Sequence, residues 1–214
     1  MVRQASTSAA EFLPGRRTLE NLRSAAQSCE GCDLYRDATQ TVFGEGAEKA
    51  SLMLVGEQPG DMEDREGHPF VGPAGRILDR ALAEAEIPRQ RVYITNAVKH
   101  FKFIQRGKRR LHQKPLIRQV TACRPWLESE FQVIQPKVVV CMGATAAQSV
   151  LGRSVRVTEE RGRFLSDGAR AVFLTTHPSA ILRLREKSER DAAYRQLVDV
   201  MKLVGDKLRQ MQGL

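Results

Sequence analysis

The sequence lacks any apolar stretch long enough to cross a membrane. Its longest unbroken apolar run is Val138–Met142, whereas a membrane-spanning helix needs about 20 consecutive apolar residues. The first 17 residues also lack the apolar segment that a secretory signal carries. These absences argue against integral membrane proteins and exported proteins, so we expect a cytoplasmic protein.

Acidic residues are too few to balance the basic ones. Lys and Arg number 34 against 25 Asp and Glu, which gives a net charge of +9. This excess favours a polyanionic partner, of which nucleic acid is the commonest. The 214 residues, 42% of them hydrophobic, suffice for one domain with a core of its own. Residues 1–16 show no periodicity and are predicted to be a mobile tail, so we expect a single, monomeric domain over residues 17–214.

Short apolar segments alternate with segments of helical periodicity along the chain. The apolar segments have the pattern of strands and cover residues 51–55, 92–95, 138–142 and 171–175. This alternation predicts a three-layer α/β sandwich around a central four-stranded, mostly parallel sheet. Ligands bind beyond the carboxyl ends of such strands. The segments that follow the strands should therefore meet at one edge; they are Gly56–Asp61, Asn96–Lys99, Gly143–Thr145 and His177–Ser179.

The four cysteines are few enough to be considered one by one. Cys29 and Cys32 form a Cys-x-x-Cys pair, which is typical of a metal site or a redox pair and also arises by coincidence. Cys123 is a candidate third ligand and His100 a candidate fourth, whereas Cys141 lies in an apolar strand and is interpreted as a core thiol. The spacing alone favours zinc, with an iron–sulfur cluster as the second possibility.

No acidic residue interrupts the segment Lys99–Arg118, which carries eight basic residues interleaved with Phe101 and Phe103. Such a run is often only a solvated surface, but this density of cations favours a loop that contacts nucleic acid. His112 lies inside the run. A histidine in a loop is ordinarily just exposed; here the surrounding cations should disfavour the imidazolium and leave a neutral, nucleophilic ring.

Four further residues are candidates for a binding pocket at the ends of the strands. Glu57, Phe70, Asn96 and His177 each have an ordinary structural explanation when taken alone: charge balance, core packing, a turn, and a strand end that satisfies backbone groups. Together they supply a carboxylate, an aromatic ring, an amide and an imidazole at one sheet edge. That combination predicts a pocket for a planar polar ligand.

Four motifs, taken in order, resemble one known family. Gly56–Asp61, Pro69–Gly75, Thr95–Lys99 and His177–Ser179 resemble the motifs of the iron–sulfur uracil-DNA glycosylases, and the similarity extends from about Cys29 to Arg183. Two further features resemble the UdgX subfamily, whose members become covalently bonded to the DNA site from which they excise uracil. These features are His100, where ordinary members have cysteine, and the inserted segment Lys108–His112.

The resemblance implies roles that composition and spacing do not supply. It implies a 4Fe–4S cluster in place of zinc, with Cys29, Cys32, His100 and Cys123 as ligands. It implies catalytic roles for Glu57, His112 and His177, and substrate contacts from Gln58, Asp61, Phe70 and Asn96. It further implies DNA contacts from Lys108, Arg109, Arg110, Ser179 and Arg183.

The activity implied by the resemblance is uracil excision followed by covalent capture of the DNA. The enzyme would flip uracil out of the DNA and break its glycosidic bond. His112 would then bond to C1′ of the abasic site, so that each molecule reacts once. We expect uracil-containing DNA as partner, single-stranded by preference and duplex as well, and therefore a nucleoid-associated protein. Two alternatives stay open at this point: an ordinary multiple-turnover glycosylase, and a non-catalytic DNA-binding module stabilised by a cluster.

Overall fold

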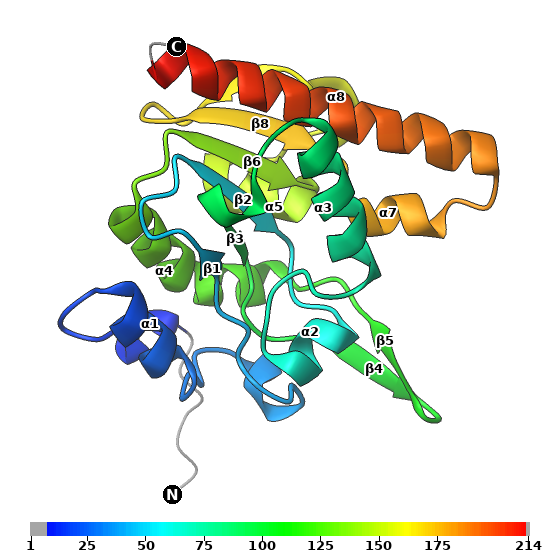
Figure 1. Ribbon diagram of the computed structural model, residues 1–214. Helices are drawn as coiled ribbons and strands as arrows, with labels where there is room; N and C mark the ends of the chain where they lie inside the picture. The colour runs from blue at the N-terminus through cyan, green and yellow to red at the C-terminus, as the bar shows by residue number, and fades with distance from the viewer. Residues whose placement is uncertain (1–7, 213–214) are drawn as a thin grey trace, which may run out of the picture.

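A six-stranded sheet runs through the centre of the computed structural model, which describes residues 8–212 (Figure 1). The strand order is β1-β3-β2-β6-β8-β7. The four middle strands are parallel, and the two edge strands are antiparallel to their neighbours. The strands are β1 (Glu45–Gly46), β2 (Leu52–Gly56), β3 (Val92–Asn96), β6 (Val138–Met142), β7 (Phe164–Ser166) and β8 (Ala171–Thr175).

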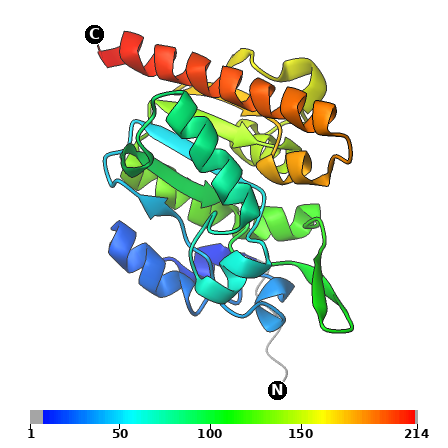
Figure 2. The ribbon, with the colours of Figure 1, turned by 45° about the vertical axis from the view of Figure 1, so that its right-hand side comes forward.

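Helices cover both faces of this sheet, which explains why the four middle strands are buried along their whole length. One face packs against α3 (Pro73–Glu84), α7 (Pro178–Arg183) and α8 (Lys187–Gln212). The other packs against α4 (Ile117–Ile134) and α5 (Ala144–Leu151), and α1 (Leu19–Ala26) packs on α4. Figures 1 and 2 show these layers, and the predicted three-layer α/β fold is confirmed.

The remaining elements are short and lie at the ends of the layers. They are η1 (Ala9–Phe12), η2 (Asp33–Arg36), α2 (Asp61–Glu66), η3 (Arg89–Arg91), α6 (Val157–Glu160) and a separate pair of strands, β4 (Phe103–Arg106) and β5 (Arg109–His112). Within residues 8–212, no helix is both long enough and apolar enough to span a bilayer.

The structure differs from the sequence prediction in the number of strands. The four predicted strands are present and parallel, but β1 and β7 extend the sheet at its edges. These edge strands are two and three residues long, too short to show an alternating pattern. The segment predicted as a basic loop instead contains the β4–β5 hairpin, which pairs Phe103 with His112 and turns at Gly107, where φ is +58°.

The fold also begins earlier in the chain than residue 17. In η1, Ala9 is buried, and a side chain at Gly31 would collide with the backbone of Ala9. The second half of the predicted tail therefore packs on the domain, beside α4. The rest of that prediction, residues 1–7, lies outside the described residues.

Candidate active site

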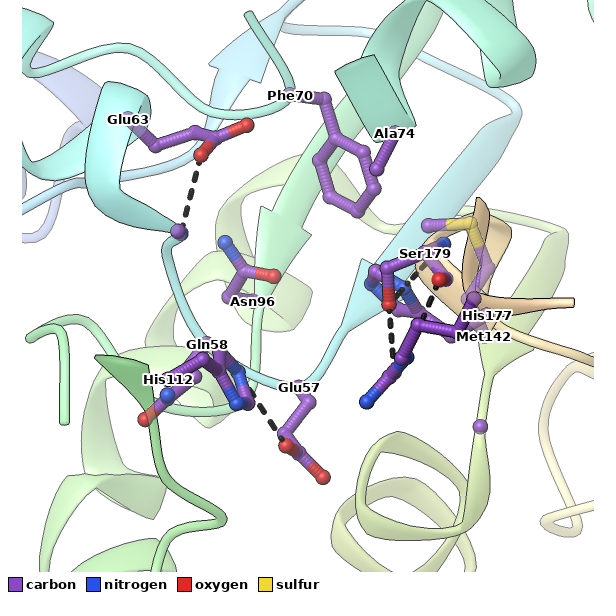
Figure 3. Close-up of a pocket in the computed structure, with 13 residues that line it drawn as sticks. Glu57, Gln58, Glu63, Phe70, Ala74, Asn96, His112, Met142, His177 and Ser179 are labelled. Atoms are coloured by element: carbon purple, nitrogen blue, oxygen red, sulfur yellow. Dashed lines mark hydrogen bonds and ion pairs between the residues drawn. The ribbon is translucent and has the colours of Figure 1, made fainter. Parts of the chain in front are cut away.

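The carboxyl ends of the parallel strands enclose a cavity of about 150 Å³ (Figure 3). Pockets for drug-sized ligands usually measure about 300–1,000 Å³, so this one suits a single small ring. The sequence prediction that polar groups meet at this edge is confirmed for most of the candidates. Those lining the cavity are Glu57, Gln58, Phe70, Asn96, His112, His177, Ser179 and Arg183.

Phe70 forms an apolar wall of the cavity. It is buried in a left-handed conformation with φ of +58°, a strained state that is frequent at functional sites. Two glycines make room for it: a Cβ at Gly75 would collide with the Phe70 carbonyl, and a Cβ at Gly56 would collide with its ring. The ring centroid lies 5.7 Å from that of His177. A flat ligand can stack on this wall.

Asn96 presents a hydrogen-bond acceptor that no described residue satisfies. The residue is 2% exposed, and Oδ1 accepts no hydrogen bond from the part of the chain that the structure describes. A buried polar atom left in this state is costly. Because Asn96 lines the cavity, a ligand N–H is the group that would satisfy it.

His177 is held as a neutral donor. It caps α7, and its Nδ1 accepts a hydrogen bond from the backbone N–H of Ser179 at 3.1 Å. Burial, together with the nearby His112 and Arg183, lowers the pKa of His177 to about 4. At neutral pH the ring therefore carries its single proton on Nε2, and this N–H is available to a ligand in the cavity.

Glu57 and His112 face each other across the mouth of the cavity. His112 Nε2 lies 3.8 Å from Glu57 Oε1, with side chains 44% and 24% exposed. The other carboxylate oxygen, Oε2, accepts a hydrogen bond from the Thr145 hydroxyl at 2.5 Å. Thr145 thus orients the carboxylate with one oxygen directed to the histidine. Sequence reasoning assigned no role to Thr145, although its position just after β6 was the available signal.

The pKa of His112 is lowered, as expected, but the cause differs from the expected one. Burial is the largest cause, and Arg183 adds to it, while Glu57 opposes both. The cations of its own hairpin are not among the causes: Arg106, Lys108 and Arg109 are exposed to solvent, and Arg110 is paired with Asp61 and Asp64.

The side chain of Gln58 holds the base of the hairpin. Its Nε2 donates to the carbonyls of Lys102 and Gln113, at 3.2 and 3.0 Å, and its Oε1 accepts from the N–H of Lys102 at 3.2 Å. These two residues flank β4 and β5, so the amide fixes both ends of the hairpin that carries His112. The backbone around Gln58 was predicted to line the substrate pocket, and Gln58 does line the cavity, while its side-chain amide is engaged by the hairpin.

Arg110 anchors the middle of the same hairpin. Its guanidinium forms ion pairs with Asp61 and with the fully buried Asp64, the latter at 2.6 Å, and lies over the rings of Phe101 and Phe103. Its side chain is only 11% exposed. Arg110 was expected to contact DNA and Asp61 to contact substrate, but in the structure they bind each other, and Asp61 is not part of the cavity lining.

The other predicted DNA contacts lie where DNA can reach them. Lys108 and Arg109 are exposed at the tip of the hairpin, which projects from the body of the molecule (Figures 1 and 2). Arg183 and Ser179 lie at the cavity, and Arg183 donates to the Ser179 hydroxyl at 3.0 Å. Cations therefore flank the cavity on the hairpin side and the α7 side.

Three of the predicted metal ligands are thiols that lie near one another. Cys29, Cys32 and Cys123 influence one another electrostatically, and burial raises the pKa of the Cys123 thiol to about 12. Two receive N–H hydrogen bonds, Cys29 from Trp126 at 3.2 Å and Cys123 from the backbone of Lys99 at 3.3 Å. Within the described residues, however, no three His, Cys, Asp or Glu side chains stand in a metal-binding arrangement. Cys141 is fully buried in β6, as predicted.

His100 has a defined tautomer. Its Nε2 lies 2.9 Å from the Thr41 hydroxyl, and that hydroxyl donates its only hydrogen to the carbonyl of Ala26 at 2.7 Å. Nε2 must therefore be the donor to Thr41, which leaves the lone pair of the neutral ring on Nδ1. Burial lowers the pKa of His100 to about 4 and keeps the ring neutral.

Glu63 is a second residue that the sequence reading missed. Its carboxylate accepts from the backbone N–H of Gly60 at 3.1 Å and of Gly72 at 3.0 Å. It therefore joins the segment after β2 to the segment that carries Phe70. The spacing Gly60–Glu63 at the start of α2, typical of a capping box, was the signal that could have found it.

Comparison with known proteins agrees with this geometry. The family model described as the uracil DNA glycosylase superfamily matches residues 43–202. The chain belongs to this superfamily. A type-4 uracil-DNA glycosylase from Sulfurisphaera tokodaii is 34% identical over 186 residues, covering 81% of each chain. One from Thermotoga maritima is 35% identical over 174 residues, covering 80% of this chain and 87% of the relative.

Superfamily membership confirms the broader part of the resemblance seen in the four motifs. All four lie inside the matched region, and three of them contribute Glu57, Asn96 and His177 to one cavity. The fourth contributes Phe70. The narrower resemblance, to UdgX, depends on residues outside these motifs, above all His112 and His100.

Proposed function

We propose that this protein excises uracil from DNA and then bonds covalently to the abasic site through His112. The observation that supports the first step best is the unsatisfied Oδ1 of buried Asn96, in a cavity that His177 and Phe70 also line. Uracil offers N3–H to this oxygen and O4 to the amide NH₂. Cytosine has an acceptor at N3 and a donor at position 4, so the same amide disfavours it.

Bond breaking needs stabilisation of two opposite charges. The glycosidic electron pair leaves with uracil, and the negative charge is spread over its O2. The neutral His177 donates its Nε2–H to O2, as a preorganised oxyanion donor does. Positive charge develops on the sugar at the same time, and the carboxylate of Glu57 at the cavity mouth stabilises it.

The second step uses His112 in place of water. Its lowered pKa keeps a lone pair on the ring at neutral pH. One ring nitrogen forms a bond to the positively charged C1′ that the departed uracil leaves behind, so the ring becomes a cation whose remaining N–H proton is on the other nitrogen. Glu57, whose Oε1 lies 3.8 Å from Nε2 of His112, stabilises the cation. The remaining N–H proton passes to this carboxylate or to solvent, and the uracil anion takes a proton from solvent. No other reactant is required.

DNA contacts would come from both sides of the cavity. Lys108 and Arg109 at the hairpin tip and Arg183 at α7 would neutralise phosphates on either side of a flipped nucleotide, and the Ser179 hydroxyl would donate a hydrogen bond to one of them. Because the base must leave its stack, single-stranded DNA reacts at lower cost than duplex.

We further propose that Cys29, Cys32, Cys123 and His100 hold a 4Fe–4S cluster. Thiolates with N–H donors directed at their sulfurs are typical of such clusters. The tautomer of His100 supports its role, because a ligating histidine donates its second ring N–H to a neighbouring acceptor, as Nε2 does to Thr41. When bound, the cluster would supply a structural cross-link between the N-terminal segment and the segment after β3.

A denaturing gel after incubation with a uracil-containing oligonucleotide tests the proposed function. We expect wild-type protein to shift the DNA covalently, and His112→Ser to give an abasic product without a shift. His68→Ser is the matched control, since His68 is exposed, pairs with Glu45 and lies outside the cavity; it should behave as wild type. Abasic product without adduct from wild-type protein would indicate an ordinary glycosylase, and unchanged DNA would indicate a binding module.

A further inference from the structure

Directly behind the cavity lies a buried ion pair that the proposed mechanism does not use. Lys99 Nζ lies 2.6 Å from Glu130 Oε2, and both side chains are 0% exposed. The ammonium also donates to the Thr95 hydroxyl at 2.6 Å and to the backbone carbonyl of Asn96 at 2.7 Å. All three of its protons therefore have acceptors.

Glu130 is equally well satisfied. Besides Lys99, its carboxylate accepts from the Tyr93 hydroxyl at 3.0 Å, from the Thr95 hydroxyl at 2.9 Å and from the backbone N–H of Gly44 at 3.2 Å. Stability alone is a weak reason for such a network, because replacing a buried ion pair with apolar residues of similar volume is often neutral or stabilising. A complete polar network does, however, fix the geometry of the groups that it contacts.

The group that needs such fixing is Asn96. Its Oδ1 has no partner among the described residues, so this acceptor does not anchor the side chain to the protein. The orientation of the amide must then come from the backbone, and the backbone carbonyl of Asn96 is one of the three acceptors of Lys99. Gly56 lets the amide lie against β2, since a Cβ there would collide with Oδ1.

We propose that the Lys99–Glu130 ion pair positions Asn96, so that its side-chain amide keeps the orientation needed to hydrogen-bond the ligand in the cavity. The inference rests on the proposed function, because uracil is the ligand that Asn96 would read. Lys99 acts through the carbonyl of Asn96 and does not line the cavity. Lys99 also donates its backbone N–H to Cys123, so it links Asn96 to the segment proposed to bind the cluster.

The test replaces both partners at once, because removing one would leave the other charge buried and unpaired. In Lys99→Met/Glu130→Gln the side-chain volumes are nearly kept. The matched control is Arg170→Met/Asp167→Asn, another ion pair, which lies before β8, at the end of the sheet away from the cavity. Single-turnover uracil release at saturating DNA, the affinity for DNA and the iron content are measured for each variant.

We expect the Lys99–Glu130 variant to release uracil at least ten-fold more slowly, with DNA affinity and iron content within two-fold of wild type. The control variant should keep the wild-type rate. In the background of Asn96→Ala, neutralising the pair should change the rate less than two-fold, because the side chain that it positions is gone. If the ion pair had a purely structural role, the fold-losses in rate from neutralising the pair and from Asn96→Ala would instead multiply.

Three results would overturn the inference: a wild-type rate in the folded double variant, an equal loss in the control, or multiplicative losses with Asn96→Ala. If the double variant does not fold, Thr95→Val replaces it, because this change removes one hydroxyl of the network and keeps both charges. Thr95→Val should slow uracil release several-fold, and a wild-type rate in this variant would also overturn the inference. Failure of wild-type protein to release uracil would instead refute the proposed function, so the two failures are distinguishable.

Discussion

His112 Nε2 lies 3.8 Å from Glu57 Oε1, while the other oxygen of the carboxylate accepts a hydrogen bond from Thr145. The carboxylate is therefore held from one side and presented to the histidine on the other. This arrangement is that of a base and an orienting group around a nucleophile. The reactivity of His112 therefore depends on two residues: Glu57 supplies the negative charge, and Thr145 orients the carboxylate that carries it.

Glu57→Gln should slow adduct formation at least ten-fold. The amide still accepts from Thr145 but carries no charge to stabilise the cation on His112 or to take its proton, and general-base groups contribute about 10²–10⁴-fold to rates. The rate of the gel shift at saturating DNA measures this. Thr145→Val should reduce this rate less, since the charge of Glu57 remains and only the orientation of its carboxylate is less restricted. Equal losses in the two variants would contradict the division of roles.

The pH dependence of adduct formation should show an acid limb below pH 6.5. Only the neutral ring is nucleophilic, and the pKa of His112 is lowered from 6.5, chiefly by burial. The rate should therefore stay level through neutral pH and fall as the pH drops through the lowered pKa. Arg183 lowers this pKa and Glu57 raises it. Arg183→Gln should move the limb to higher pH and Glu57→Gln to lower pH; shifts in the same direction would contradict the assignment.

Asn96→Ala should impair the processing of uracil while leaving general DNA affinity intact. The substitution removes the amide that reads the base, whereas the cations of the hairpin and of α7 remain. We expect single-turnover release at least ten-fold slower and binding to uracil-free DNA within two-fold of wild type, with a similar dependence on salt. An unchanged rate and an unchanged preference for uracil over cytosine would refute the pocket assignment.

The cluster assignment predicts opposite results for two buried cysteines. Cys123→Ser should purify without iron or sulfide, because it removes one proposed ligand. Cys141→Ser should retain both, since Cys141 lies inside β6 and influences none of the other thiols. Iron and sulfide analysis of anaerobically purified protein, with the visible spectrum, decides between them. Colourless wild-type protein that contains zinc would contradict the proposal.

Much of this site was predictable because its residues follow long, fully buried strands. β2, β3, β6 and β8 have continuous apolar patterns, and parallel strands bring the residues after them to one edge, so Glu57, Asn96 and His177 could be grouped from sequence. The hairpin could not be foreseen in the same way. Its strands have four residues each and only one Gly at the turn, and its charges conceal the pattern.

The role of single side chains was harder to predict than their location. Arg110 looks like its neighbours Lys108 and Arg109 in sequence, and only its pairing with Asp61 and Asp64, more than forty residues earlier in the chain, distinguishes it. The same holds for Gln58, whose amide bonds to Lys102 and Gln113 depend on the register of the hairpin. Long-range partners of this kind leave no local trace in the sequence.

Arg110 and Arg109 should therefore give different phenotypes despite their adjacent positions. Arg110→Met removes the ion pairs that anchor the hairpin and leaves the buried carboxylate of Asp64 without a cation, so His112 should lose its placement over the cavity. Uracil release should continue, because Glu57, Phe70, Asn96 and His177 lie outside the hairpin. We expect the ratio of covalent adduct to free abasic product to fall at least ten-fold.

Arg109→Met should weaken DNA binding and reduce the steepness of its salt dependence by the amount that one lost phosphate contact contributes. The ratio of adduct to abasic product should stay unchanged. Gel analysis of both products, with binding measured at several salt concentrations, separates the two effects. If Arg110→Met altered only affinity, or if Arg109→Met altered the ratio, the hairpin would not depend on Arg110 for the placement of His112. The contrast is sharp because the two side chains differ in one respect that the structure defines: Arg109 is exposed at the hairpin tip, whereas the guanidinium of Arg110 is enclosed by two carboxylates and two aromatic rings.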